Sequence, residues 1–307
     1  MITKAAIHNR ANMGQQQRKD VMVSESALVV SDSSPPPTTE THTPTVAEIE
    51  LAALLRLKEP RQYNDLLPPL DEEEFELLHK VLIESPKLEH RSHLRLDFDN
   101  NFILELAQLQ KHQTLPPSEA GAFCSPHLIN HILAKERSFS AAKKKMQVGW
   151  EGRISSYVNA PGRSWGKDTD TVYAPMIWNN KHWVGLAINI SLGIIELLDP
   201  NPDLYSKRKV DRMMSPLLNM FPYLVHKLCV STTQSNSLKP YTWTRVPNLY
   251  NNKRSGDCGP VSAKFMEMHA SGDPAPHMSG MKDILVDQLR KQYALDLYHD
   301  LVLPIYF

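Results

Sequence analysis

The sequence predicts an α+β protein in which helices flank a central mixed or antiparallel sheet. Three strand-like segments joined by short connections, residues 170–178, 182–190 and 193–199, are rich in aromatic and β-branched residues and predict a meander. Helical patterns precede and follow this meander. Hydrophobic residues make up 41% of the 307 residues, which is enough for a sizeable core.

Composition narrows the class of protein. The 34 basic residues balance 34 acidic residues, so overall charge gives no attraction toward nucleic acid or an anionic membrane. No apolar run approaches the ~18 residues of a membrane span, and the N-terminus lacks the apolar core of a signal peptide. Three cysteines are too few, and odd in number, for a disulfide framework. We therefore expect an intracellular protein with no specific nucleic-acid partner and no membrane partner.

The N-terminal third divides into two segments. Residues 1–45 are polar and are predicted to form a disordered tail, because they cannot bury enough apolar surface to offset their ordering entropy. Residues 46–113 are predicted to form a helical extension. Thr45 is a possible N-cap of its first helix, and acids fill the first turn of a second helix within 68–85. A third helix is expected within 100–113.

Residues 114–307 are predicted to form the main domain around the meander. Ser125 and Pro126 are typical of a helix start. An amphipathic stretch follows the meander and is expected to break near Pro222, because proline removes a helix hydrogen bond. The other elements expected after the meander are a strand within 241–249 and helices over 259–270 and about 281–299.

The stretch "SGDCGP" places Cys258 at a hinge between a loop and a helical pattern. Gly256 and Gly259 permit a sharp turn, and Pro260 suits a first helical turn. A cysteine at a helix N-terminus is favoured as a thiolate. Asp257 could cap this helix. The local sequence leaves two readings open, a nucleophile and a buried structural cysteine.

A nucleophilic cysteine needs a base, and the base needs an orienting group. His182 opens the strand "HWVGLAINI", and Asp199 closes the following strand, 17 residues later. The start of the first strand lies near the end of the second in an antiparallel pair, so both side chains should meet at one sheet edge. A solvent-exposed strand terminus for His182 and a turn role for Asp199 are the plainer alternatives.

These stretches together carry a resemblance. "DTVYAPMIWNNKHWVGLAINISLGIIELLDPNP" and "RSGDCGPVSAKFMEMHA" resemble the Ulp1-like cysteine proteases (family C48), the SUMO-deconjugating enzymes, and in particular the plant, transposon-associated Ulp1-like proteins. The resemblance implies a cysteine-protease (Ulp1/adenain-like) fold over 114–307, without metal or cofactor. It implies that Cys258 is the nucleophile, His182 the general base and acid, and Asp199 the orienting carboxylate. It also suggests the nucleus or the cytosol.

The resemblance extends to residues around the triad, with two departures. Trp183 follows the histidine, as does the family tryptophan that helps form a narrow tunnel for a diglycine tail. The family's oxyanion glutamine is missing before the cysteine, and Asn252, or less readily Asn251, is expected to donate in its place. The N-terminal tryptophan segment that covers the tail in the family is not found before residue 150.

The resemblance predicts a thiol isopeptidase that cleaves after the C-terminal glycine of a SUMO- or ubiquitin-like modifier, whose conjugates are the expected partners. The two departures motivate an alternative, a catalytically impaired module that binds a modifier or another partner without turnover. A more distant alternative is acyl transfer, because bacterial effector acetyltransferases resemble the same order of His, acid and Cys.

Overall fold

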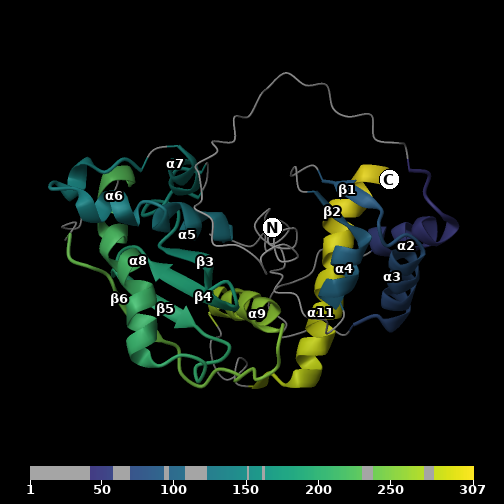
Figure 1. Ribbon diagram of the computed structural model, residues 1–307. Coiled ribbons are helices and arrows are strands. Elements are labelled where there is room, and N and C mark those ends of the chain that lie inside the picture. The colour runs from purple at the N-terminus through teal and green to yellow at the C-terminus, as the bar shows by residue number, and fades with distance from the viewer. Residues whose placement is uncertain are drawn as a thin grey trace, which may run out of the picture.

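The fold is described from a computed structural model of the chain (Figure 1). The predicted tail, up to residue 41, lies outside the described residues. None of the helices in the described ranges is long and apolar enough to cross a membrane. The structure describes residues 42–57, 70–92, 97–107, 123–150, 152–160, 163–229, 238–272 and 280–307.

A four-stranded mixed sheet forms the centre of the molecule. The predicted meander is confirmed: β3 (Thr171–Trp178), β4 (His182–Asn189) and β5 (Ile194–Leu198) pair in antiparallel fashion. The predicted later strand is β6 (Thr242–Arg245), which pairs with β5 in parallel. Side chains alternate between the two faces of each strand, so the sheet buries a hydrophobic cluster on each side.

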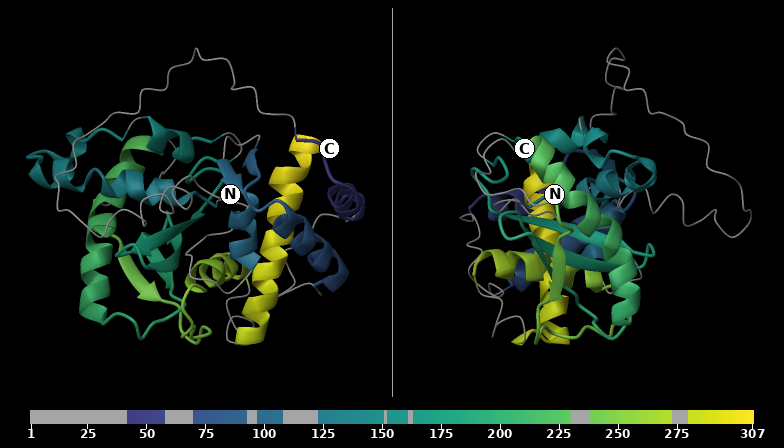
Figure 2. Two further views of the ribbon diagram at one scale, coloured as in Figure 1. Left: turned by 45° about the vertical axis from the view of Figure 1, so that its right-hand side comes forward. Right: turned by 90° about the vertical axis from the view of Figure 1, so that its left-hand side faces the viewer.

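Helix α8 (Lys207–Leu228) covers one face of the sheet, and α9 (Cys258–Ala270) covers the other (Figures 1 and 2). The predicted break near Pro222 is wrong, because α8 runs through it as one helix of 22 residues. Proline at this position cannot donate to the Leu218 carbonyl. That carbonyl instead accepts from the Tyr241 N–H at 3.0 Å, so the tertiary fold replaces the missing helix bond.

A glycine lets α9 approach β4 closely. A Cβ atom at Gly185 would lie 2.7 Å from Met266 Cγ and 3.2 Å from the Ser262 carbonyl oxygen, both on α9. No other residue type fits this contact without a shift. The close approach sets the height of α9 above the strand that begins with His182.

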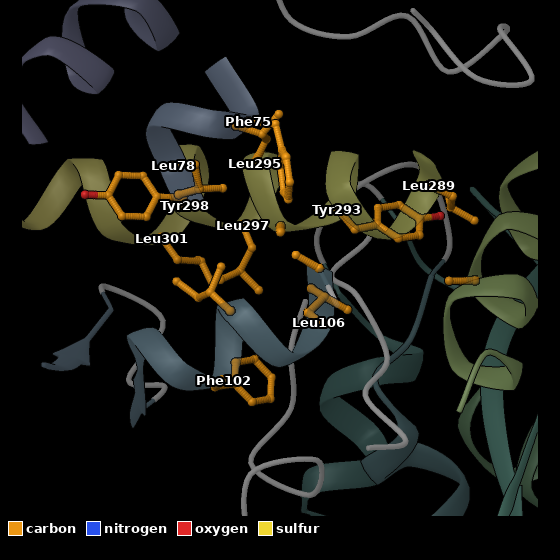
Figure 3. Packing of buried hydrophobic residues seen from close by; sticks show 14 of the residues in the cluster. Phe75, Leu78, Phe102, Leu106, Leu289, Tyr293, Leu295, Leu297, Tyr298 and Leu301 are labelled. Atoms are coloured by element: carbon orange, nitrogen blue, oxygen red, sulfur yellow. The ribbon is translucent and has the colours of Figure 1, made fainter. Parts of the chain in front are cut away.

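The N-terminal helices pack on the C-terminal helix. Helix α11 (Asp283–Leu297) contacts α4 (Asn100–Ala107) and α3 (Glu72–Glu84), and α2 (Val46–Arg56) contacts α3. Figure 3 shows apolar side chains that these helices bury, among them Phe75, Leu106 and Leu295. The predicted cap is confirmed, because the Thr45 hydroxyl accepts from the Glu48 N–H and the Glu48 carboxylate accepts from the Thr45 N–H. These helices share one hydrophobic cluster with α9.

The remaining elements complete the two sides of the molecule. Ser125 caps α5 as predicted, with its hydroxyl accepting from the His127 N–H at 3.1 Å. The elements are the strands β1 (Glu89–Arg91) and β2 (Asp97–Asp99), the helices α5 (Pro126–Leu133), α6 (Glu136–Ala141), α7 (Arg153–Val158) and α12 (Leu303–Tyr306), the 3₁₀ turn η1 (Lys145–Gln147), and the π-helical turn η2 (Tyr298–Val302), which continues α11.

Candidate active site

Three sequence-predicted residues from three elements meet at one edge of the sheet. His182 is the first residue of β4, Asp199 directly follows β5, and Cys258 is the first residue of α9. Antiparallel pairing places Gly185 opposite Leu198, so the start of β4 lies beside the end of β5. All three side chains are buried. The fold therefore brings together a thiol, an imidazole and a carboxylate that are distant in the sequence.

The carboxylate of Asp199 is held on both oxygens. Oδ1 lies 2.8 Å from His182 Nε2 and accepts from the Asn201 N–H at 3.0 Å. Oδ2 accepts from Arg245 Nη2 at 2.9 Å. With Nε2 bonded to Asp199, Nδ1 is the ring nitrogen of His182 that remains for Cys258. This bond orients the imidazole and stabilises its protonated form.

The electrostatics of His182 favour an imidazolium. Burial lowers its pKa, but hydrogen bonds with Asp199 and Cys258 outweigh burial and raise the pKa to about 9. This raised pKa favours the imidazolium form of His182 at neutral pH. An imidazolium beside a thiol is the environment that supports a thiolate.

The sulfur of Cys258 receives further support from the backbone. The Trp183 N–H points at Sγ with an N···S distance of 3.5 Å. Ser262 on α9 fixes that stretch of β4, because its hydroxyl donates to the Trp183 carbonyl at 3.0 Å. The position at the start of α9 adds the positive end of the helix dipole. In contrast, burial raises the pKa of Cys124 to about 12 and that of Cys229 to about 11, so both stay thiols.

The turn before Cys258 is held by a buried ionic cluster. Asp257 occupies the N-cap position of α9, but its backbone is helical (φ −89°, ψ −10°) and its side chain makes no cap bond. The carboxylate instead accepts from Arg254 Nε at 2.6 Å and from Arg290 Nη1 at 3.2 Å. Arg290 also donates to the carbonyls of Gly256 and Glu105, at 3.3 and 3.0 Å. The cluster ties the cysteine turn to α11 and α4.

The sequence reasoning missed three arginines, Arg245, Arg254 and Arg290. Each pairs with a carboxylate that lies next to, or within, the predicted triad. No local sequence pattern marks them, because Arg245 and Arg290 reach carboxylates that lie 46 and 33 residues away in the chain. Only the spacing of Arg254 and Asp257, three residues apart, is visible in the sequence.

Both asparagines predicted to stabilise an oxyanion have other partners. The Asn252 side chain is buried and bonds its own loop, with Nδ2 donating to the Arg254 carbonyl at 3.2 Å and Oδ1 accepting from the Arg254 N–H at 3.0 Å. The Asn251 amide donates to Asp203 Oδ2 at 2.7 Å. Trp183, the predicted tunnel residue, is 2% exposed and lies in the hydrophobic cluster with α9.

A buried thiol at a helix N-terminus, with an imidazole and a carboxylate in series, is the arrangement of thiol-nucleophile enzymes. The family model described as "Ulp1 protease family, C-terminal catalytic domain" matches residues 99–305. The chain belongs to the Ulp1 protease family, and its predicted cysteine-protease fold is confirmed. None of the curated proteins matches the chain.

A solved structure of a Ulp1 protease domain supports the fold. The chain is similar to the C-terminal Ulp1 protease domain in complex with Smt3, the yeast ortholog of SUMO, with 12% identity and a TM-score of 0.50 over 77% of this chain and 98% of that chain. It is also similar to the catalytic domain of the Ulp1-like SUMO protease from Chaetomium thermophilum, with 15% identity and a TM-score of 0.42 over 77% and 92% of the two chains.

Proposed function

We propose that this protein is a thiol isopeptidase that cleaves after the C-terminal glycine of a SUMO- or ubiquitin-like modifier. The observation that carries the proposal is the convergence of the hydrogen-bonded pair Asp199–His182 with the buried thiol of Cys258 at the start of α9. Membership of the Ulp1 protease family supports the reaction class. The complex of the Ulp1 protease domain with Smt3 supports a modifier of the SUMO type as substrate.

In the proposed reaction the Cys258 thiolate attacks the carbonyl carbon of the terminal glycine. The carbonyl π bond opens to an oxyanion, which the backbone N–H of Cys258 is placed to stabilise. The imidazolium of His182 then gives its proton to the lysine amine as the C–N bond breaks, which leaves a thioester. A water molecule gives a proton to neutral His182 and attacks the thioester, and the modifier leaves with a free carboxylate while the thiolate is restored. Asp199 holds the imidazole in place through both halves.

Two further roles belong to the proposal. Trp183 forms one wall of the tunnel for the diglycine tail, and it does so from the strand that also supplies His182. Asn252, or failing that Asn251, supplies the second oxyanion donor. Because the Asn252 amide bonds the Arg254 carbonyl in the free protein, this role requires the amide to turn when substrate binds.

An impaired module that binds a modifier without turnover is the second candidate. The bonded amides of Asn251 and Asn252 favour it, since loss of one oxyanion donor costs roughly 10²–10³ in rate. Both candidates bind a modifier, so turnover is the property that separates them.

The test uses fluorogenic substrates made from SUMO and from ubiquitin with a C-terminal amidomethylcoumarin. The isopeptidase releases the fluorophore from one of them, and Cys258→Ala abolishes release while it retains binding in a titration. If the wild type and Cys258→Ala both bind a modifier and neither releases the fluorophore, the result supports the impaired module. Neither binding nor release by a folded protein contradicts both.

The proposal also includes the domain boundaries, the family subtype and the cellular compartment of the protein. Residues 114–307 act as the protease domain, and the helical extension 46–113 supports it through the contact of α4 with α11. The family match begins at residue 99, within that extension. We propose the plant, transposon-associated subtype for this protein and the nucleus or cytosol as its compartment. Limited proteolysis would release 114–307 as a stable fragment if that boundary is right.

A further inference from the structure

We infer that Arg245 is a positioning residue of this site, which holds the Asp199 carboxylate toward His182 and thereby sets the pH dependence of Cys258 reactivity. The inference rests on the proposed function in that it takes these three residues as the reacting group and its support. Arg245 itself touches neither the thiol nor the imidazole by any hydrogen bond in the described part of the chain.

The pairing of β6 with β5 in the sheet places Arg245 next to Asp199. Strand β6 runs parallel to β5 with Arg245 opposite Leu197, and the Val246 N–H donates to the Leu197 carbonyl at 3.1 Å. The guanidinium therefore lies beside the end of β5, where Asp199 begins the next turn. Its Nη2 bonds Oδ2 at 2.9 Å, while His182 bonds Oδ1 at 2.8 Å. Because each carboxylate oxygen bonds a different partner, the Asp199 carboxylate cannot rotate without breaking a charge-assisted hydrogen bond.

Charge balance gives Arg245 a second effect. With a thiolate on Cys258 and an imidazolium on His182, the carboxylate of Asp199 and the guanidinium of Arg245 bring the sum to zero. Without Arg245 the same group carries a net negative charge, with Asp199 and His182 only 2% and 3% exposed. A buried uncompensated charge is costly, and the group responds by holding its protons to higher pH.

The other charged and titratable groups around the site keep their own partners. Tyr205 lies 6.1 Å from the His182 ring between centroids, and the Lys209 ammonium lies 4.0 Å from the centre of the Tyr205 ring. Asp257 is paired with Arg254 and Arg290, Arg254 also pairs with Asp287, and Asp203 accepts from Asn251. A substitution at Arg245 removes none of these contacts, so it isolates the charge next to Asp199.

The remaining geometry of Arg245 argues against a role in stability alone. Its Nε is buried and has no hydrogen-bond partner in the described residues. A buried donor without a partner carries a desolvation cost. The position of Arg245 therefore satisfies the Asp199 carboxylate at the cost of one unsatisfied donor of its own.

The experiment measures the rate of Cys258 alkylation by iodoacetamide from pH 4 to pH 11, with the adduct located by peptide mass spectrometry. The wild-type profile has two inflections, which are the two protonation steps of the Cys258–His182 pair taken together. In Arg245→Gln both inflections move upward by at least about one pH unit, because one charge within ~12 Å has that effect at an effective dielectric constant near 20. Arg245→Lys moves them by less than half as much. Lys207→Gln, which removes an exposed cation from the ion pair with Asp211, leaves them in place.

An Arg245→Gln profile that coincides with the wild-type profile would overturn the inference. If that variant does not fold, Asp199→Asn is compared with the double variant Asp199→Asn/Arg245→Gln, which buries no net charge. The double variant titrates about one pH unit higher if Arg245 acts on the pair. Coincident profiles of these two variants overturn the inference as well.

Alkylation needs no modifier, so the two proposals fail separately. A shifted profile in a protein that neither binds nor cleaves any modifier substrate supports Arg245 and contradicts the proposed function. A Cys258 profile with a single inflection that His182→Ala leaves unchanged contradicts the triad itself.

Discussion

The ionic cluster beneath the cysteine turn gives the most quantitative prediction about the fold. Arg290 is 1% exposed and donates to Asp257, Gly256 and Glu105, so Arg290→Met leaves the fully buried Asp257 carboxylate with Arg254 alone. Removing one partner of a buried ion pair costs about 3–5 kcal/mol. Because Arg254 still compensates Asp257, we expect a loss of about 3 kcal/mol in the free energy of unfolding.

Urea unfolding followed by tryptophan fluorescence measures this loss. Lys291→Gln is the matched control on the same helix, because Lys291 makes a surface ion pair with Glu72 and its loss should cost under about 1 kcal/mol. Arg290→Lys keeps the positive charge but loses the planar guanidinium. Its loss of unfolding free energy should therefore lie between those of Arg290→Met and Lys291→Gln. If Arg290→Met unfolds within about 1 kcal/mol of the wild type, the cluster does not anchor the turn.

Two further predictions concern the position and the charge of the site. Gly185→Ala should destabilise the protein by about 1–3 kcal/mol and slow Cys258 alkylation, because the new Cβ pushes α9 away from β4. In the control Gly280→Ala, nothing lies within 4 Å of the new Cβ, so neither stability nor alkylation should change. Equal stability of the two variants would refute the close contact between Gly185 and α9. The pKa of His182 is raised from 6.5 to about 9, so its stabilisation is complete below pH 6.5 and is lost as pH rises through 9. The free energy of unfolding of the wild type relative to His182→Gln should therefore fall by about 3 kcal/mol between pH 6 and pH 10, and a flat difference would contradict the assignment.

The elements that organise the site could be predicted from the sequence because their signals are local. Alternating β-branched and aromatic residues mark β3 and β4, and the turn between them is short. The spacing from His182 to Asp199 then follows from hairpin geometry, which places both at one edge. Cys258 was predicted at a helix start from its glycines and proline, and α9 begins there.

The parts that could not be predicted depend on contacts between distant segments. The break expected at Pro222 is absent because Tyr241, from another segment, bonds the carbonyl that proline leaves without a donor. Asp257 was expected to cap α9, but Arg254 and Arg290 draw its carboxylate away from the helix end. The sequence around Arg245 indicates only an ordinary strand residue. The parallel pairing of β6 with β5, which places Arg245 beside Asp199, has no local sequence signal.

A covalent trap tests directly whether Cys258 is the nucleophile. The protein is incubated with SUMO and ubiquitin carrying a C-terminal vinyl sulfone, and the products are analysed by intact and peptide mass spectrometry. We expect one adduct, with the modifier attached to Cys258. It should fail to form in Cys258→Ser and should form much more slowly in His182→Ala. A folded protein that forms no adduct, or forms it at Cys124 or Cys229, would contradict the assignment of Cys258 as the nucleophile.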